Sequence, residues 1–61
     1  MNGKTHFSWE VLSSHQQVYQ IAWWGPEGDL VALEVVEAPT LGEAVARTAT
    51  VMVSEVIRRQ Q

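Results

Sequence analysis

The sequence predicts an α+β domain, in which a three-stranded antiparallel meander is packed on one face by a single C-terminal helix. Residues 18–36 contain two β-rich runs separated by a Gly-Pro-Glu-Gly-Asp break, which is the sequence form of a hairpin. Beyond Pro39, apolar residues recur at helical spacing until about residue 59. We therefore expect residues 1–61 to form a single small domain of order β-β-β-α.

Length and composition limit how such a domain is stabilised. A chain of 61 residues is near the lower size at which a domain folds without staples, and the absence of cysteine excludes disulfides and thiolate metal sites. The hydrophobic fraction of 46% is typical of a globular protein, whereas only 18% of the residues are charged. So few charges leave apolar surface exposed in a monomer, which favours a bound partner or an oligomer, with a homodimer expected first.

The first strand is expected near residues 5–12, where apolar and polar side chains alternate. Phe7, Trp9 and Val11 then share one face of the strand, and the polar residues between them share the other. The polar stretch 13–17 is expected to form a loop. The second strand is expected near residues 18–24 and the third near residues 30–37, joined by a turn at 25–29.

Parity sets the expected register, because directly opposed residues point to the same side of a sheet. With loops at 13–17 and 25–29, one face is apolar throughout. Its expected rows are Phe7–Trp23–Val31, Trp9–Ile21–Leu33 and Val11–Tyr19–Val35. We expect the helix to cover this face, so that Trp9, Ile21 and Leu33 are among the most buried side chains.

The helix is expected near residues 40–59. Thr40 and Glu43 fit a capping box, in which the hydroxyl and the carboxylate satisfy free amide donors. Arg58 and Arg59 lie where positive charge stabilises the carbonyl end of the helix dipole. The expected core stripe consists of Leu41, Val45, Ala49, Met52 and Val56.

The second face of the sheet is half apolar, and one helix cannot cover both faces. We expect this open face to bind a protein partner or a second copy of the chain. Trp24 is the expected anchor, because tryptophan is enriched at binding hot spots. The expected protein-binding residues are Trp24, Leu30, Val18, Leu12, Val36, Glu10, Gln20 and Glu34.

Groups that carry enzyme chemistry are scarce in the sequence. Glu10 and Glu34 are expected about 10 Å apart across two strand spacings, but a flat three-stranded sheet offers no cleft for a substrate. His6 and His15 lie near opposite ends of the first strand, too far apart to share a metal ion. The glycines at 25–29 lack the lysine and the following helix of a phosphate-binding loop. We therefore expect no enzyme activity, no metal and no cofactor.

The charge balance and hydropathy indicate which partners to expect. The net charge of −3 is opposite in sign to the basic surface that binds a phosphate backbone, so we expect no nucleic-acid partner. The alternative is a nucleic-acid-binding module in which Trp24, Tyr19 or His6 stacks on bases. The sequence lacks an apolar run of the roughly 18 residues that span a membrane, so we expect no membrane partner and a cytoplasmic protein.

The expected order of elements resembles DNA-binding domains of the integrase arm-binding type. The start of the helix, Thr40-Leu41-Gly42-Glu43-Ala44, is similar to that in HicB-type antitoxins, which implies an antitoxin-like regulator as a further alternative. Glu10, Gln20 and Glu34 on the expected open face argue against DNA binding. The leading hypothesis is a small, non-enzymatic protein-binding module that self-associates or docks on a host protein. Such short acidic chains are typical of accessory or inhibitor proteins of phages or mobile elements.

Overall fold

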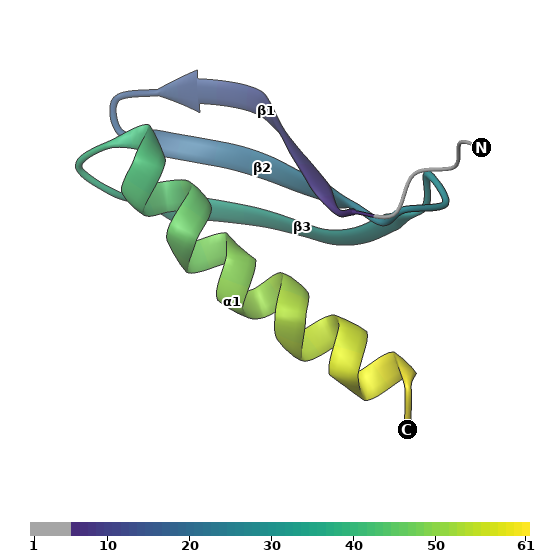
Figure 1. Ribbon diagram of the computed structural model, residues 1–61. Helices are drawn as coiled ribbons and strands as arrows, with labels where there is room; N and C mark the ends of the chain where they lie inside the picture. Colours follow the sequence, from purple (N-terminus) through teal and green to yellow (C-terminus); the bar gives the residue numbers. More distant parts are fainter. Residues whose placement is uncertain (1–5) are drawn as a thin grey trace.

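The computed structural model describes residues 6–61 and has the predicted β-β-β-α order. Three antiparallel strands form an open sheet in the order β1-β2-β3, and a single helix follows them (Figure 1). The fold class predicted from the sequence is confirmed. The elements are β1 Ser8–His15, β2 Val18–Trp24, β3 Leu30–Glu37 and α1 Leu41–Arg59.

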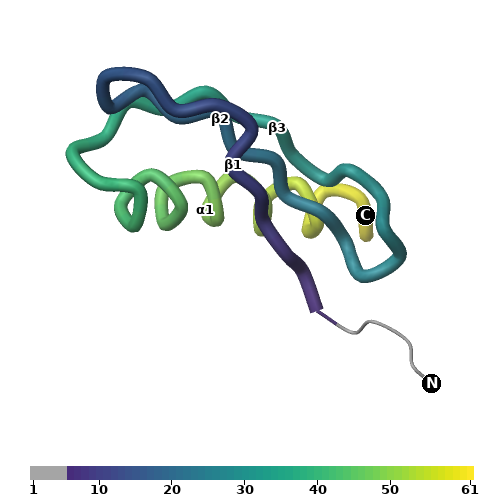
Figure 2. Tube along the Cα trace, turned by 90° about the horizontal axis from the view of Figure 1, so that it is seen from above, coloured from purple at the N-terminus to yellow at the C-terminus, as the bar shows by residue number. Residues whose placement is uncertain are grey.

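Helix α1 covers one face of the sheet and leaves the other face open (Figure 2). The helix packs mainly on β3 and, to a smaller extent, on β2. The core lies between these elements and contains Ile21 and Trp23 from the sheet and Ala44 and Met52 from the helix. Burial of these apolar side chains is the main stabilising contribution in a chain without disulfides.

The first hairpin differs from the prediction. The sequence suggested a strand at residues 5–12 and a loop at 13–17, but β1 continues to His15, and the turn contains just Gln16 and Gln17. Both turn residues have positive φ, as a two-residue primed turn requires. A bulge between Val11 and Ser13 shifts the register so that the short turn can close. Residue 5 lies outside the described residues.

The second hairpin begins as predicted and then slips by one residue. Trp24 pairs with Leu30 across the expected loop, which is closed by hydrogen bonds from Gly25 N to the Asp29 carbonyl and from Gly28 N to the Gly25 carbonyl. A register shift at Trp23/Trp24 then changes the pairing along the remaining strand.

This slip exchanges the two faces of β3. Ile21 pairs with Glu34 and Ala22 with Leu33, so Glu34 and Val36 point to the helix side, and Leu33 and Val35 point to the open side. The predicted register of β2 with β3 is therefore wrong.

Burial follows the observed register. Ile21 is fully buried, as predicted, but the side chains of Trp9 and Leu33 are 45% and 46% exposed. Leu33 is exposed because it lies on the open side of the sheet. Trp9 lies on the helix side, in the same row as Trp23, but α1 is displaced toward β3 and leaves β1 largely uncovered.

The Thr40 hydroxyl caps the helix as predicted, but the Glu43 carboxylate pairs with Arg47, and Met52 is the one residue of the predicted stripe that is buried rather than partly buried or exposed. The Thr40 hydroxyl accepts a hydrogen bond from Glu43 N at 3.2 Å. The buried positions are Ala44, Thr48 and Met52, whereas Leu41 from the predicted stripe is exposed. Small residues at two of these positions let the helix approach the sheet closely. The remaining residues of the predicted stripe, Val45, Ala49 and Val56, lie beside the buried stripe and are partly buried.

Candidate functional site

The open face of the sheet is the main candidate for a binding surface. Going from β1 to β3, its rows are Ser8–Trp24–Leu30, Glu10–Ala22–Leu33 and Ser13–Gln20–Val35. Leu30, Leu33 and Val35 are all exposed, and Val35 is the most open of the three at 66%. We call these three residues the β3 apolar strip. Because these side chains point to the same side of one strand, they lie next to one another and form an apolar strip rather than scattered contacts.

Most of the predicted binding residues lie on or beside this face. Trp24, Leu30, Val18, Glu10 and Gln20 are on the open side, as the register shows. Glu10 and Gln20 lie in adjacent rows of this face.

Three predicted residues are placed differently. Glu34 and Val36 were predicted on the open face, but they lie on the helix side because the register of β3 slips by one residue. Leu12 lies at the bulge in β1, where its side chain is exposed. The prediction missed Leu33 and Val35. One pattern in the sequence pointed to them: β3 has apolar residues at both odd and even positions, so either set could lie on the open face.

Trp24 is held in place on the open face. Its indole Nε1 donates a hydrogen bond to Glu10 Oε1 at 3.3 Å, joining β2 to the edge strand β1. Ala22 lies between these two residues on the same side of the sheet and is almost fully buried. The hydrogen bond restrains the indole ring before any partner binds, which lowers the entropy cost of using it as an anchor.

The two edges of the sheet differ in what covers them. The guanidinium of Arg47 donates to the carbonyl of Glu37 at 2.8 Å, and that of Arg59 donates to the carbonyl of Leu30 at 3.2 Å. These two arginines occupy both ends of the β3 edge. No comparable side-chain contact reaches the backbone of β1 among residues 6–61. A charged cover of this kind protects an edge strand from pairing with another chain.

The same arginines take part in ion pairs along α1. Arg47 pairs with Glu43, and Arg59 pairs with Asp29 at 3.2 Å and with Glu55 at 3.5 Å. A hydrogen bond from Arg58 lowers the pKa of Glu55, and the Arg59 guanidinium adds to this effect. All three arginines of the chain are thus paired with carboxylates. Arg47 lies on the side of α1 that faces β3, and Arg58 and Arg59 lie in its last turn.

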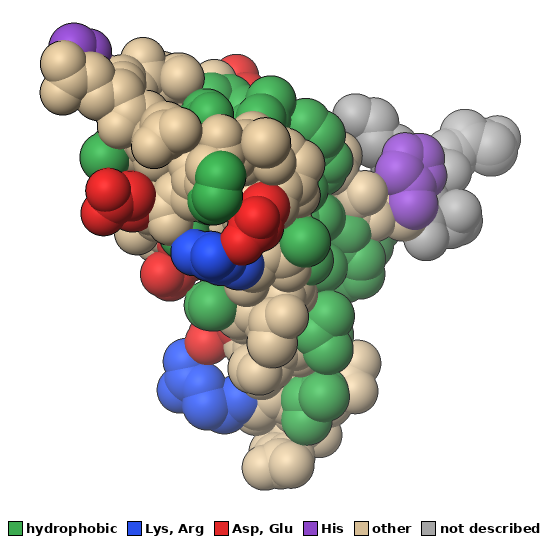
Figure 3. Space-filling view, turned by 90° about the vertical axis from the view of Figure 1, so that its left-hand side faces the viewer, with side chains coloured by type: hydrophobic (Ala, Val, Ile, Leu, Met, Phe, Trp, Pro, Cys, Tyr) green, Lys and Arg blue, Asp and Glu red, His purple; other side chains and the backbone are tan. Residues whose placement is uncertain are grey.

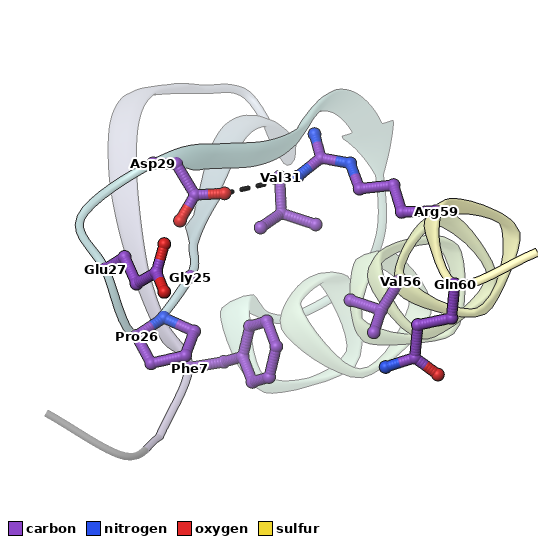
Figure 4. Close-up of a pocket in the computed structure, with 9 residues that line it drawn as sticks. All are labelled: Phe7, Gly25, Pro26, Glu27, Asp29, Val31, Val56, Arg59 and Gln60. Atoms are coloured by element: carbon purple, nitrogen blue, oxygen red, sulfur yellow. Dashed lines mark hydrogen bonds and ion pairs between the residues drawn. The ribbon is translucent and has the colours of Figure 1, made fainter.

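A pocket of 190 Å³ opens between the β2–β3 loop, the residue before β1 and the last turns of α1 (Figure 4). Phe7, Val31 and Val56 give it an apolar wall, and the paired side chains of Arg59 and Asp29 lie at its rim. A cavity of roughly 150 Å³ holds one benzene-sized ring, so this pocket has room for a single ring or branched side chain. Among the described residues, its lining includes no serine, cysteine or histidine that could serve as a nucleophile or its base.

The part of the chain that the structure describes holds no group of three histidine, cysteine, aspartate or glutamate side chains placed to bind a metal ion. It also has no helix long and apolar enough to cross a membrane. No family model, curated protein or solved structure matches the chain. The candidate site therefore rests on its own geometry.

Proposed function

We propose that this chain is a non-enzymatic protein-binding module that docks on a partner protein through the open face of its sheet. The observation that carries the proposal is the β3 apolar strip, three exposed aliphatic side chains beside the ordered indole of Trp24. Aliphatic and aromatic residues in this arrangement form the desolvated centre of a protein interface.

Charge on the open face indicates the chemistry of the partner. Glu10 lies on this face at the β1 side, and Glu37 lies at its end in the row of Val18. The rows that the register defines contain no lysine or arginine. The complementary partner surface is therefore apolar in the centre, with lysine or arginine at its rim.

The proposal is tested with Trp24→Ala and with Leu33→Glu, each compared with the wild-type chain. Both variants alter the open face without touching the buried residues between the sheet and α1. We expect enrichment of the partner on immobilised protein to fall more than tenfold for each variant, because a hot-spot side chain commonly contributes 2 kcal/mol or more, about thirtyfold in affinity.

Ile57→Glu is the matched control, since Ile57 is about as exposed as Leu33 but lies on α1. Circular dichroism establishes that all three variants keep the fold. A protein that binds the wild type and the Ile57 variant, and neither open-face variant, supports the proposal. Equal loss with all three variants, or no loss with any, contradicts it.

A further inference from the structure

The outer edge of β1, to which no other strand of the described residues pairs, provides a second surface besides the open face. We propose that two copies of the chain pair antiparallel through β1, joining their sheets into one with six strands. This contact uses a different surface from the β3 apolar strip, so it leaves the open face available to a partner protein.

The first observation is the contrast between the two edges. Arginine side chains from α1 occupy carbonyls at both ends of β3, whereas β1 presents its backbone amides and carbonyls without such a cover within the described residues. An uncovered edge strand is a template for pairing with another chain. Of the two edges, β1 is therefore the one at which we expect another strand to add.

The second observation is the exposed apolar surface on the helix side of β1. Because α1 is displaced toward β3, Trp9 is 45% exposed although it lies in the same row as the buried Trp23. Phe7 and Val11, on the same side of β1, are partly buried against the core. A second β1 strand beside the first would cover the outer side of all three.

The side of the helix next to β1 is apolar as well. At 100° per residue, Val45, Ala49, Val53 and Val56 lie on the side of α1 away from Arg47. Figure 3 shows hydrophobic side chains continuing down one side of the helix, away from the arginine and glutamate side chains. An antiparallel pair related by a two-fold axis perpendicular to the sheet places both helices on the same face, so these apolar sides face each other across the axis.

The side chains of β1 are compatible with pairing to a second copy, and they select the register. The bulge after Val11 limits regular pairing to the first half of the strand. With Trp9 on the two-fold axis, Trp9 opposes its own copy and Ser8 opposes Glu10 of the second chain. With Glu10 on the axis, two carboxylates would oppose each other directly, which is destabilising. The Trp9-centred register is therefore the one we infer.

The size of the contact sets its strength. About five residue pairs at roughly 3.3 Å per residue give a strand contact about 17 Å long, which is short for a protein interface. Interfaces of this size are at the weak end of specific complexes. We therefore expect a dimer with a dissociation constant on the order of 10 μM, visible in sedimentation velocity as a concentration-dependent mass.

Cysteine cross-linking tests the contact directly, since the chain has no cysteine of its own. Opposed residues in an antiparallel pair have Cα atoms roughly 4.5–5.5 Å apart, within the range that a disulfide spans. We expect Trp9→Cys to give a covalent dimer in a glutathione redox buffer. The control Val35→Cys, on the open face, should cross-link at least tenfold more slowly. Faster cross-linking at residue 35 than at residue 9 would overturn the inference.

A charge pair at Ser8 tests the register without removing Trp9. Ser8→Lys should tighten the dimer and Ser8→Glu should weaken it, each by roughly 2- to 30-fold, because two Ser8–Glu10 pairs form per dimer. Ser54→Lys and Ser54→Glu, on exposed helix surface, make the same changes in net charge and should have smaller effects. A wild type that stays monomeric through the series, or variants at residue 8 that shift the mass in the same direction, contradicts the inferred dimer.

Discussion

The hydrogen bond between Trp23 and Thr48 links the sheet to the helix at the level of single residues. The indole Nε1 of Trp23 donates to Thr48 Oγ1 at 2.7 Å, and the Thr48 hydroxyl donates to the Val45 carbonyl at 3.0 Å. Both residues are buried, so an unpaired indole N–H would be costly here. The sequence predicted that Trp23 is in the core but gave no signal for its partner, because 25 residues separate the two side chains.

Substitutions at Thr48 should separate the hydrogen bond from packing. Thr48→Val keeps the shape of the side chain but leaves the Trp23 indole without an acceptor, and we expect it to destabilise the fold by about 1–3 kcal/mol. Thr48→Ser keeps both hydrogen bonds and removes one methyl group, at a cost of about 1 kcal/mol. Urea denaturation followed by tryptophan fluorescence measures both values. A valine variant that is at least as stable as the serine variant would show that the hydrogen bond contributes little.

Elements were predicted more reliably than the pairing between them. β2 and β3 both match the predicted ranges, because their aromatic and β-branched runs end at glycine and proline signals. β1 extends further than predicted, because Ser13 and Ser14 lie in an edge strand whose side chains reach solvent. The register of β3 could not be chosen from its pattern. Ala32 and Val36 have one parity, Leu33 and Val35 the other, and a bulge decided which pair faces the helix.

The β1–β2 turn gives a prediction at the scale of the hairpin. Gln16 and Gln17 have φ values of 51° and 67°, a region that costs L-residues other than glycine and asparagine about 1–2 kcal/mol each. The double change Gln16→Asn and Gln17→Gly supplies the residues that a two-residue primed turn prefers. We expect it to raise the free energy of unfolding by about 1 kcal/mol. This gain is smaller than the strain that is relieved, because glycine has more conformational entropy in the unfolded chain and this entropy opposes folding.

Gly28→Ala is the matched change in the opposite direction. Gly28 has φ of 84° in the β2–β3 loop and has open space around it, so alanine meets backbone strain and no steric clash. We expect a loss of about 1 kcal/mol in the same thermal or urea measurement. Destabilisation by the Asn-Gly turn would mean that the side chains of Gln16 and Gln17 stabilise the hairpin more than the strain costs it.

The position of the helix over the sheet is a property of the whole molecule that the sequence did not reveal. One helix cannot cover all of a three-stranded sheet, and the pattern of apolar residues predicted that the second face of the sheet would stay uncovered. The structure adds the helix side of β1, because α1 lies mainly over β3, where Arg47 and Arg59 contact the strand and Thr48 accepts a hydrogen bond from Trp23. These contacts join residues far apart in the chain, so they cannot be predicted from local sequence patterns.

The charge distribution of the whole molecule gives a prediction about nucleic acid. The net charge is −3, and each of the three arginines is already paired with a glutamate or an aspartate. Releasing one for a phosphate would break an ion pair and, for Arg47 and Arg59, a hydrogen bond to the β3 edge. The aromatic Trp24 lies beside the carboxylate of Glu10, which repels a phosphate backbone.

We therefore expect no binding to single- or double-stranded DNA or to RNA at physiological salt, measured by fluorescence anisotropy with labelled oligonucleotides. Glu10→Gln is the informative companion variant, because it keeps an acceptor for the Trp24 indole while removing the negative charge. If stacking on Trp24 were the function, this variant would bind more tightly than the wild type. Micromolar binding by the wild type that weakens steeply as salt is added would contradict the prediction, because it would mean that the arginines exchange their carboxylate partners for phosphates.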